Sequence, residues 1–131
     1  MITAIGNNVA ESFASLENSK SGIGTLENIR SRHKAIIPVG EIKASNEELT
    51  AMAGLRPDQQ STRTALLGLI AVQEALRSSG ISNIKEYRTG IISATSVGGM
   101  CMTEDLWYDY LDTKKSGPWS YMQTLLSTCS P

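Results

Sequence analysis

Apolar residues recur at helical spacing in several parts of the chain. The longest such pattern covers residues 61–79, where apolar side chains occupy so much of the helix circumference that the pattern predicts a helix packed between two layers. Gly80 follows this segment and predicts the helix end. Nearer the start of the chain, Val9, Phe13 and Leu16 lie at positions i, i+4 and i+7, which predicts a helix with one buried stripe.

Residues with capping preferences flank the shorter helical patterns. Asn8 is the expected N-cap of the first helix, with Glu11 at the third helical position, and Lys20 and Gly22 supply stop signals. A short helix is predicted over residues 46–54, and Gly54 is expected to end it.

A fourth helix is predicted downstream, with Thr103 as its N-cap and acidic residues in its first turn. Lys114 and Lys115, followed by glycine and proline, supply its stop signals. Its expected buried face consists of Leu106, Trp107, Tyr110 and Leu111. Residues 119–128 are apolar enough for a further short helix or an ordered loop.

Two segments are predicted to be strands. Residues 1–5 form the first, and residues 89–95 form a small, apolar run of the kind found in a buried parallel strand. Residues 35–42 are expected to be an extended edge segment, because Pro38 and Gly40 disfavour a central strand. This order of elements predicts an α/β fold with a mixed, largely parallel sheet.

Composition and charge narrow the class of protein. The chain has 131 residues, 40% of them hydrophobic, and a net charge of −1, so a single domain over residues 1–131 is expected. No basic stripe with interleaved aromatic residues supports nucleic-acid binding. No apolar run reaches membrane-spanning length, and no signal peptide is evident, so a cytoplasmic location without membrane association is expected.

The residues with nucleophilic or metal-binding chemistry are few. Cys101 and Cys129 lie far apart without CxxC spacing, which argues against both a zinc site and a structural disulfide. A nucleophilic cysteine usually lies at a helix amino terminus or near an imidazole, whereas Cys129 follows an apolar helical stretch. A buried structural role is the preferred interpretation for Cys129, as it is for Cys101. His33, the one histidine, lies in a polar stretch and is expected to be exposed.

Several short segments together resemble the amino-terminal part of β-ketoacyl-[acyl-carrier-protein] synthases, which belong to the thiolase-like superfamily. Residues 2–6 resemble the family's opening strand, and residues 20–23 resemble the "GkSGI" segment after the first helix. Residues 61–80 resemble its "R…AL.A..EAL..aG" helix, and residues 88–100 resemble its "RvGviiGtg.GG" strand and turn. Asn7 and Asn8 and residues 93–95 depart from the family pattern, which leaves the subfamily open.

The resemblance implies a layered thiolase-like fold and a decarboxylative Claisen condensation of acyl and malonyl thioesters, as in fatty-acid or polyketide-type biosynthesis. It implies acyl carrier protein as a partner, a homodimer or heterodimer, no cofactor and no metal. The family's nucleophilic cysteine and histidines lie further along the chain than this sequence extends, so no catalytic residue is assigned and the chain alone is expected to be inactive.

The resemblance also points to one candidate binding segment. It places a wall of the acyl-chain pocket at Val97, Gly98, Gly99 and Met100. The same glycines are equally consistent with close helix–strand packing alone. A nucleotide-binding turn is disfavoured, because G-x-G-x-x-G is missing. Two alternatives remain open for the whole protein: a non-catalytic ketosynthase-like partner of the chain-length-factor type, and a free-standing α/β ligand-binding domain.

Overall fold

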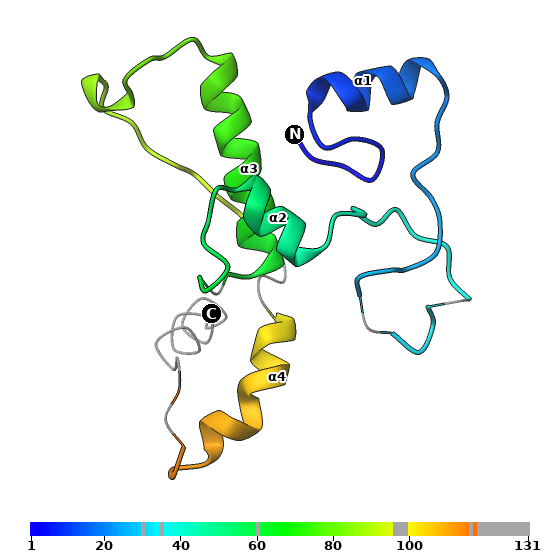
Figure 1. Cartoon of the computed structure of the whole chain (residues 1–131), viewed down its shortest axis with the longest axis vertical. Helices are drawn as coiled ribbons and strands as arrows, with labels where there is room; N and C mark the ends of the chain where they lie inside the picture. The colour runs from blue at the N-terminus through cyan, green and yellow to red at the C-terminus, as the bar shows by residue number, and fades with distance from the viewer. Residues whose placement is uncertain (30, 35, 60, 96–99, 116, 118–131) are drawn as a thin grey trace.

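The computed structural model describes residues 1–29, 31–34, 36–59, 61–95, 100–115 and 117. These residues form four α-helices and one 3₁₀ helix: α1 (Val9–Glu17), α2 (Asn46–Met52), α3 (Arg63–Ser78), η1 (Ile84–Glu86) and α4 (Met100–Leu111) (Figure 1). Their β structure is limited to two isolated antiparallel bridges, Thr3 with Gly6 and Gly24 with Val39. The described part of the chain is therefore mainly helical, and the expected sheet is not formed within it.

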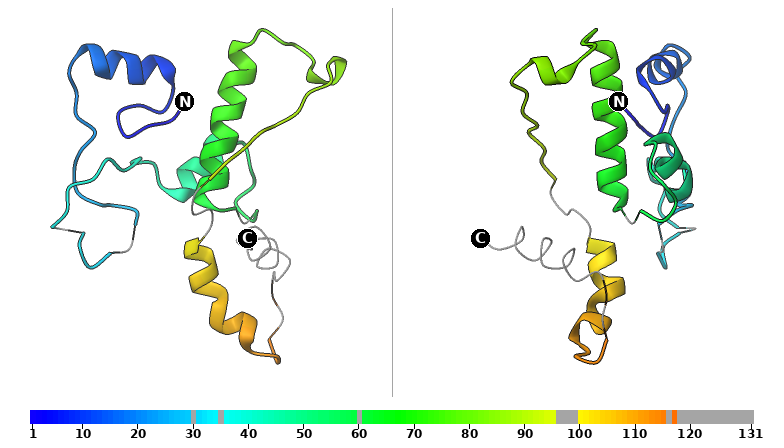
Figure 2. Two further views of the ribbon diagram at one scale, coloured as in Figure 1. Left: turned by 180° about the vertical axis from the view of Figure 1, so that it is seen from behind. Right: turned by 60° about the vertical axis from the view of Figure 1, so that its left-hand side comes forward.

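The core lies where α2 packs against α3. Leu49 and Ala53 at α2 are buried against Leu66 and Ile70 of α3, and half-buried residues such as Leu67 surround them. Both figures of the whole chain show α2 beside the first half of α3 (Figures 1 and 2). Burial of each leucine or isoleucine in this core contributes about 1.5–3 kcal/mol, so this contact is the main apolar stabilisation of the described residues.

Local capping sets the ends of α2, and the glycine end is the one that the sequence predicts. The Ser45 hydroxyl accepts from the Glu48 N–H at 3.2 Å, and the Glu48 carboxylate accepts from the Ser45 N–H at 2.8 Å, which is a capping box. Gly54 has a φ of +70°, a left-handed conformation that costs glycine little. The predicted short helix is confirmed.

The predicted long helix is also confirmed, but its surroundings differ from the prediction. The Thr62 hydroxyl accepts from the Ala65 N–H at 3.1 Å, and Gly80 follows the helix with a φ of +71°. The helix is not enclosed by two layers: an added Cβ at Gly68 would meet no atom within 4 Å. Within the described residues α2 is the only helix packed on α3. The expected sheet does not form there, so no strand layer covers the other side of α3.

The first helix forms where predicted, but it buries a different face. Phe13 and Leu16 are 60% and 65% exposed, whereas Ser12 and Ser15 are buried. The reason is the turn at residues 3–6, which packs against the serine face: the Ser15 hydroxyl donates to the Ile5 carbonyl at 2.7 Å. The prediction of a buried apolar stripe on α1 is therefore wrong.

A close backbone approach explains why glycine precedes this helix. A Cβ on Gly6 would lie 2.5 Å from the Ser12 nitrogen, so any side chain there would push the turn away from α1. The turn itself is closed by the Thr3 N–H, which donates to the Gly6 carbonyl at 2.9 Å. Residues 1–5 therefore form part of a turn and not the predicted strand.

The second predicted strand forms no β-bridge among the described residues. Residues 89–95 are extended but exposed, with Ile91 and Ile92 at 75% and 102%. Figure 2 shows this segment running back toward α4 clear of α3. A strand needs a neighbour to satisfy its backbone hydrogen bonds, and residues 1–5, the other predicted strand, are folded into their turn.

Of the predicted edge segment at residues 35–42, the described residues 36–42 form one bridge. Val39 and Gly24 exchange two backbone hydrogen bonds of 2.9 and 2.8 Å. Ile36 and Ile37 belong to a turn, in which their N–H groups donate to the His33 carbonyl. The extended character is thus restricted to the residues around Val39.

The fourth helix begins earlier than predicted. It starts at Met100, so Thr103 lies within the helix and is not its N-cap. Its expected buried face is only partly covered, because Leu106 and Tyr110 are half-buried while Trp107 and Leu111 are exposed. The helix extends away from the α2–α3 core (Figure 1), so that core does not bury this face.

No helix among the described residues combines the length and apolar character needed to cross a bilayer.

We predict that Leu66→Ala lowers the free energy of unfolding by about 2–5 kcal/mol, because it opens a cavity in the α2–α3 core. Leu16→Ala is the matched control, since it removes the same atoms from an exposed position on α1, and its effect should stay within about 0.5 kcal/mol. Urea unfolding followed by circular dichroism measures both. Equal losses in the two variants would contradict the observed burial.

Candidate functional site

The structure describes only part of the predicted binding segment. Val97, Gly98 and Gly99 lie outside the described residues, as do residues 119–128 and Cys129. Met100 is the first residue of α4, with a side chain that is 51% exposed. The proposed acyl-pocket wall therefore remains a prediction from the sequence.

Two of the three residues with nucleophilic or acid–base chemistry lie on separate elements, and the third, Cys129, is outside the described residues. Cys101 lies in the first turn of α4. His33 is exposed in a turn, where its backbone N–H donates to the Ser31 hydroxyl at 3.1 Å. Among the described residues, no group of three histidine, cysteine, aspartate or glutamate side chains is placed to hold a metal ion.

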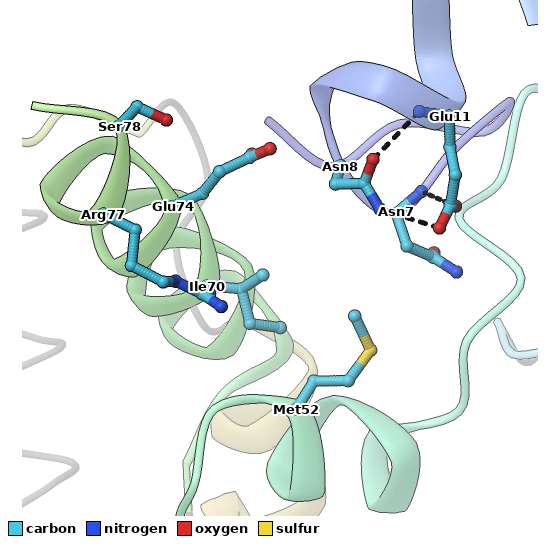
Figure 3. A pocket seen from close by; sticks show the side chains of 8 residues that line it. All are labelled: Asn7, Asn8, Glu11, Met52, Ile70, Glu74, Arg77 and Ser78. Atoms are coloured by element: carbon cyan, nitrogen blue, oxygen red, sulfur yellow. Dashed lines mark hydrogen bonds between the residues drawn. The ribbon is translucent and has the colours of Figure 1, made fainter. Parts of the chain in front are cut away.

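A pocket of about 610 Å³ lies between the start of α1 and the second half of α3 (Figure 3). Ile70 and Met52 supply apolar side chains on the α2–α3 side. Polar side chains provide the rest of the lining: Asn7, Asn8, Glu11, Glu74, Arg77 and Ser78.

The two carboxylates of this pocket already accept hydrogen bonds from other groups of the same chain. Glu74 accepts from the Val9 N–H at 2.7 Å and also contacts the amino group of Met1. Glu11 accepts from the Asn7 N–H at 2.8 Å and from the Asn8 side-chain amide at 2.7 Å. The Asn8 side-chain oxygen in turn accepts from the Glu11 N–H at 2.9 Å, so it is the predicted N-cap of α1.

These contacts define what the pocket can do. The Glu74 carboxylate faces the amino terminus of α1, where the helix dipole favours a negative charge, and it attaches α1 to α3. The lining contains no cysteine or histidine, so it offers no thiol or imidazole for covalent or acid–base chemistry. The pocket is therefore a polar junction between two helices.

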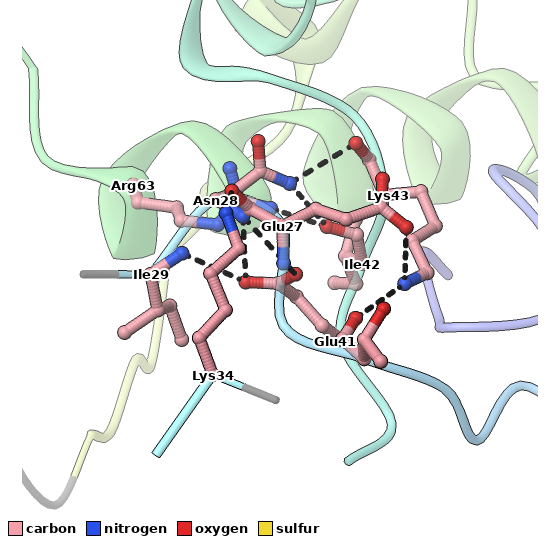
Figure 4. A network of polar contacts seen from close by, with 9 residues as sticks. Glu27, Asn28, Ile29, Lys34, Glu41, Ile42, Lys43 and Arg63 are labelled. Carbon is pink, nitrogen blue, oxygen red and sulfur yellow. Dashed lines mark hydrogen bonds and ion pairs between the residues drawn. The ribbon is translucent and has the colours of Figure 1, made fainter. Parts of the chain in front are cut away.

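A second polar cluster surrounds Glu41 (Figure 4). Its side chain is only 6% exposed, and its carboxylate accepts from three consecutive backbone N–H groups. The distances are 2.6 Å from Glu27, 3.2 Å from Asn28 and 3.0 Å from Ile29. A buried charge is costly unless it is paired and hydrogen-bonded, and this loop satisfies it.

The electrostatic balance at Glu41 favours the ionised form. Burial raises its pKa, but the hydrogen bonds from Glu27, Asn28 and Ile29 and the charge of Lys43 together lower it. The net effect places the pKa of Glu41 below its ordinary value. The carboxylate is consequently charged at neutral pH and holds residues 27–29 against residues 41–43.

Further contacts connect this cluster to the α2–α3 core. The Arg63 guanidinium donates to the Ile42 carbonyl at 2.6 Å and to the Asn46 side-chain oxygen at 3.0 Å. The Asn28 side-chain amide donates to the Lys43 carbonyl at 3.0 Å, and the Lys43 ammonium pairs with Glu27 at 2.8 Å. The cluster thus connects the loop to the first turns of α2 and α3.

Sequence reasoning did not identify Glu41 or Glu74 as organising residues. Glu41 lies in a segment predicted to be an edge strand, where an acidic residue normally faces solvent. Glu74 lies within the segment of residues 61–80 that resembles the family's long helix. The partners of both residues are backbone groups 12 or more positions away, and no local pattern encodes such a partner.

Comparison with protein-family models, with curated proteins and with solved structures finds no match to this chain.

We predict that Glu41→Gln reduces the hydrogen-exchange protection of Asn28 and Ile29 at neutral pH, by an amount equivalent to about 1–3 kcal/mol. The folded pKa of Glu41 lies below that of an unfolded glutamate, about 4.3. Its stabilisation is therefore present above that pH and is lost as the pH falls through the folded pKa. Wild type should lose this part of the protection in acid. The variant should lack the same part of the protection at every pH.

The control is Glu17→Gln, which removes a charge from an exposed position near the end of α1. Protection factors corrected for the intrinsic pH dependence of exchange should match wild type in this variant. Normal protection in Glu41→Gln, or an equal loss in Glu17→Gln, would contradict the assigned role of Glu41.

We predict that Glu74→Ala speeds amide exchange at Val9 about tenfold, because the N–H loses a charged acceptor worth ~1.5 kcal/mol or more. Arg77→Ala is the matched control: it lies on the same side of α3 and lines the same pocket, but leaves the Glu74–Val9 contact in place. Hydrogen exchange followed by NMR measures both variants. Unchanged exchange in Glu74→Ala would show that another contact attaches α1 to α3.

Proposed function

We propose that this chain is the amino-terminal part of a β-ketoacyl-[acyl-carrier-protein] synthase with a thiolase-like fold. The observation that carries the proposal is the ordered series of family-like segments between residues 2 and 100. Each segment is short and common, but their shared order and spacing are much more specific. The parent protein would join an acyl group to a malonyl thioester by decarboxylative condensation.

The exposed apolar surfaces of the chain support this proposal. The stripe of Val9, Phe13 and Leu16 on α1 is uncovered, and so are Ile91 and Ile92. A layered α/β domain buries helix faces and strands of this kind, so further polypeptide would complete the core.

In the proposal, residues 97–100 contribute one wall of the acyl pocket. The nucleophilic cysteine, its histidines and most of the carrier-protein surface would come from sequence beyond residue 131.

We predict that this 131-residue chain forms no covalent adduct with an acyl-[acyl-carrier-protein] thioester. The product of the same reading frame extended past Pro131 should gain the mass of one acyl group. Intact-mass spectrometry measures both proteins. The physical reason is that acyl transfer needs an activated thiolate, which the proposal assigns to the longer chain.

The control is a Cys101→Ser, Cys129→Ser variant of the extended protein, which should be acylated like its parent. An acyl group on Cys101 or Cys129 would contradict the assignment of the nucleophile. Failure of the extended protein to be acylated would contradict an active synthase, and its co-purification with an acylated homologue would then identify a non-catalytic partner subunit.

A further inference from the structure

Three consecutive backbone N–H groups converge on one side chain in the loop that precedes α2 (Figure 4). The Glu27 N–H donates to one carboxylate oxygen of Glu41 at 2.6 Å, and the Ile29 N–H donates to the other oxygen at 3.0 Å. The Asn28 N–H lies between them, 3.2 Å from each oxygen. Successive backbone N–H groups that point into one concavity form an anion-binding nest. Residues 27–29 have this arrangement, and the anion that they hold belongs to the chain itself.

The arrangement of these donors selects an anion with two oxygen atoms. The outer N–H groups each bind a different oxygen, and the central N–H is shared between the two. A planar carboxylate therefore satisfies all three donors, whereas a monatomic anion such as chloride offers only one acceptor atom. Because the donors belong to the backbone, this preference does not depend on the side chains of residues 27–29.

The charges beside the loop also favour an anion. The Lys34 ammonium donates to the Glu27 carbonyl at 3.2 Å, and the Lys43 ammonium donates to the Thr25 carbonyl at 3.0 Å. The Glu27 carboxylate is paired with Lys43, and its side chain is 57% exposed, so solvent and salt screen its repulsion of an anion. The Glu41 side chain is itself buried, and a hydrogen bond in such a place is stronger than one in water.

We propose that residues 27–29 form a carboxylate-binding site whose built-in ligand is Glu41, and that a free carboxylate binds there when this side chain is removed. In wild type the tethered carboxylate has the higher effective concentration, so it keeps small anions out of the site. Residues 27–29 are exposed, so a small anion can reach their N–H groups from solvent. This inference concerns the loop alone and does not depend on the proposed ketosynthase function.

Titration of a Glu41→Ala variant with sodium acetate at neutral pH tests this site. The variant should lose hydrogen-exchange protection at Asn28 and Ile29. About 200 mM acetate should then raise the protection roughly tenfold, as expected for a dissociation constant on the order of 20 mM. Sodium chloride at the same ionic strength should raise it little. The exchange rates and chemical shifts of the two amides, followed by NMR, measure the binding.

Glu41→Gln is the matched control, because its side-chain amide fills the same space and leaves no room for acetate. Wild type is the second control, since it shows any direct effect of acetate on amide exchange. No recovery in Glu41→Ala, or an equal recovery in chloride or in either control, would overturn the proposal.

A second measurement covers the case in which Glu41→Ala loses its helices. The same titration, followed by far-UV circular dichroism, should then restore the helices in acetate and not in chloride. Failure of acetate to restore them would also overturn the proposal. None of these results bears on acyl transfer by the extended protein.

Discussion

The contact between α2 and α3 is the interaction on which the other described elements depend. It buries Leu49 of the shorter helix against Leu66 and Ile70 of the longer one. A helix of only seven residues is marginal in water without tertiary packing, so α2 requires this contact. The Arg63 network and Glu74 both extend from α3, and each would lose its geometry if that helix were not held in place.

Two carboxylates extend the order of this core to the amino-terminal third of the chain. Glu74 binds the first turn of α1, and Glu41 binds the backbone of residues 27–29. In both cases a charged acceptor meets backbone N–H groups, which makes stronger hydrogen bonds than a neutral acceptor. Polar contacts therefore substitute for apolar packing in the region where α1 turns its apolar stripe outward.

The uncovered apolar surfaces connect the structure to the proposed function. A stripe on α1 and the isoleucines at positions 91 and 92 are exposed, although their sequence patterns are those of buried elements. In the proposed ketosynthase, further polypeptide would cover them.

The sequence by itself determined the local features: the α1, α2 and α3 helices, the cap of α1 at Asn8, and the helix ends at Gly54 and Gly80. These depend on groups a few residues apart, which a pattern of neighbours encodes. Only the tertiary structure decided which face of α1 is buried and whether residues 1–5 and 89–95 pair as strands. It also decided the roles of Glu41 and Glu74. Those features depend on partners that are distant in the chain. Hydrophobic periodicity indicates that a helix or strand face can be buried, but it does not indicate which residues will cover that face.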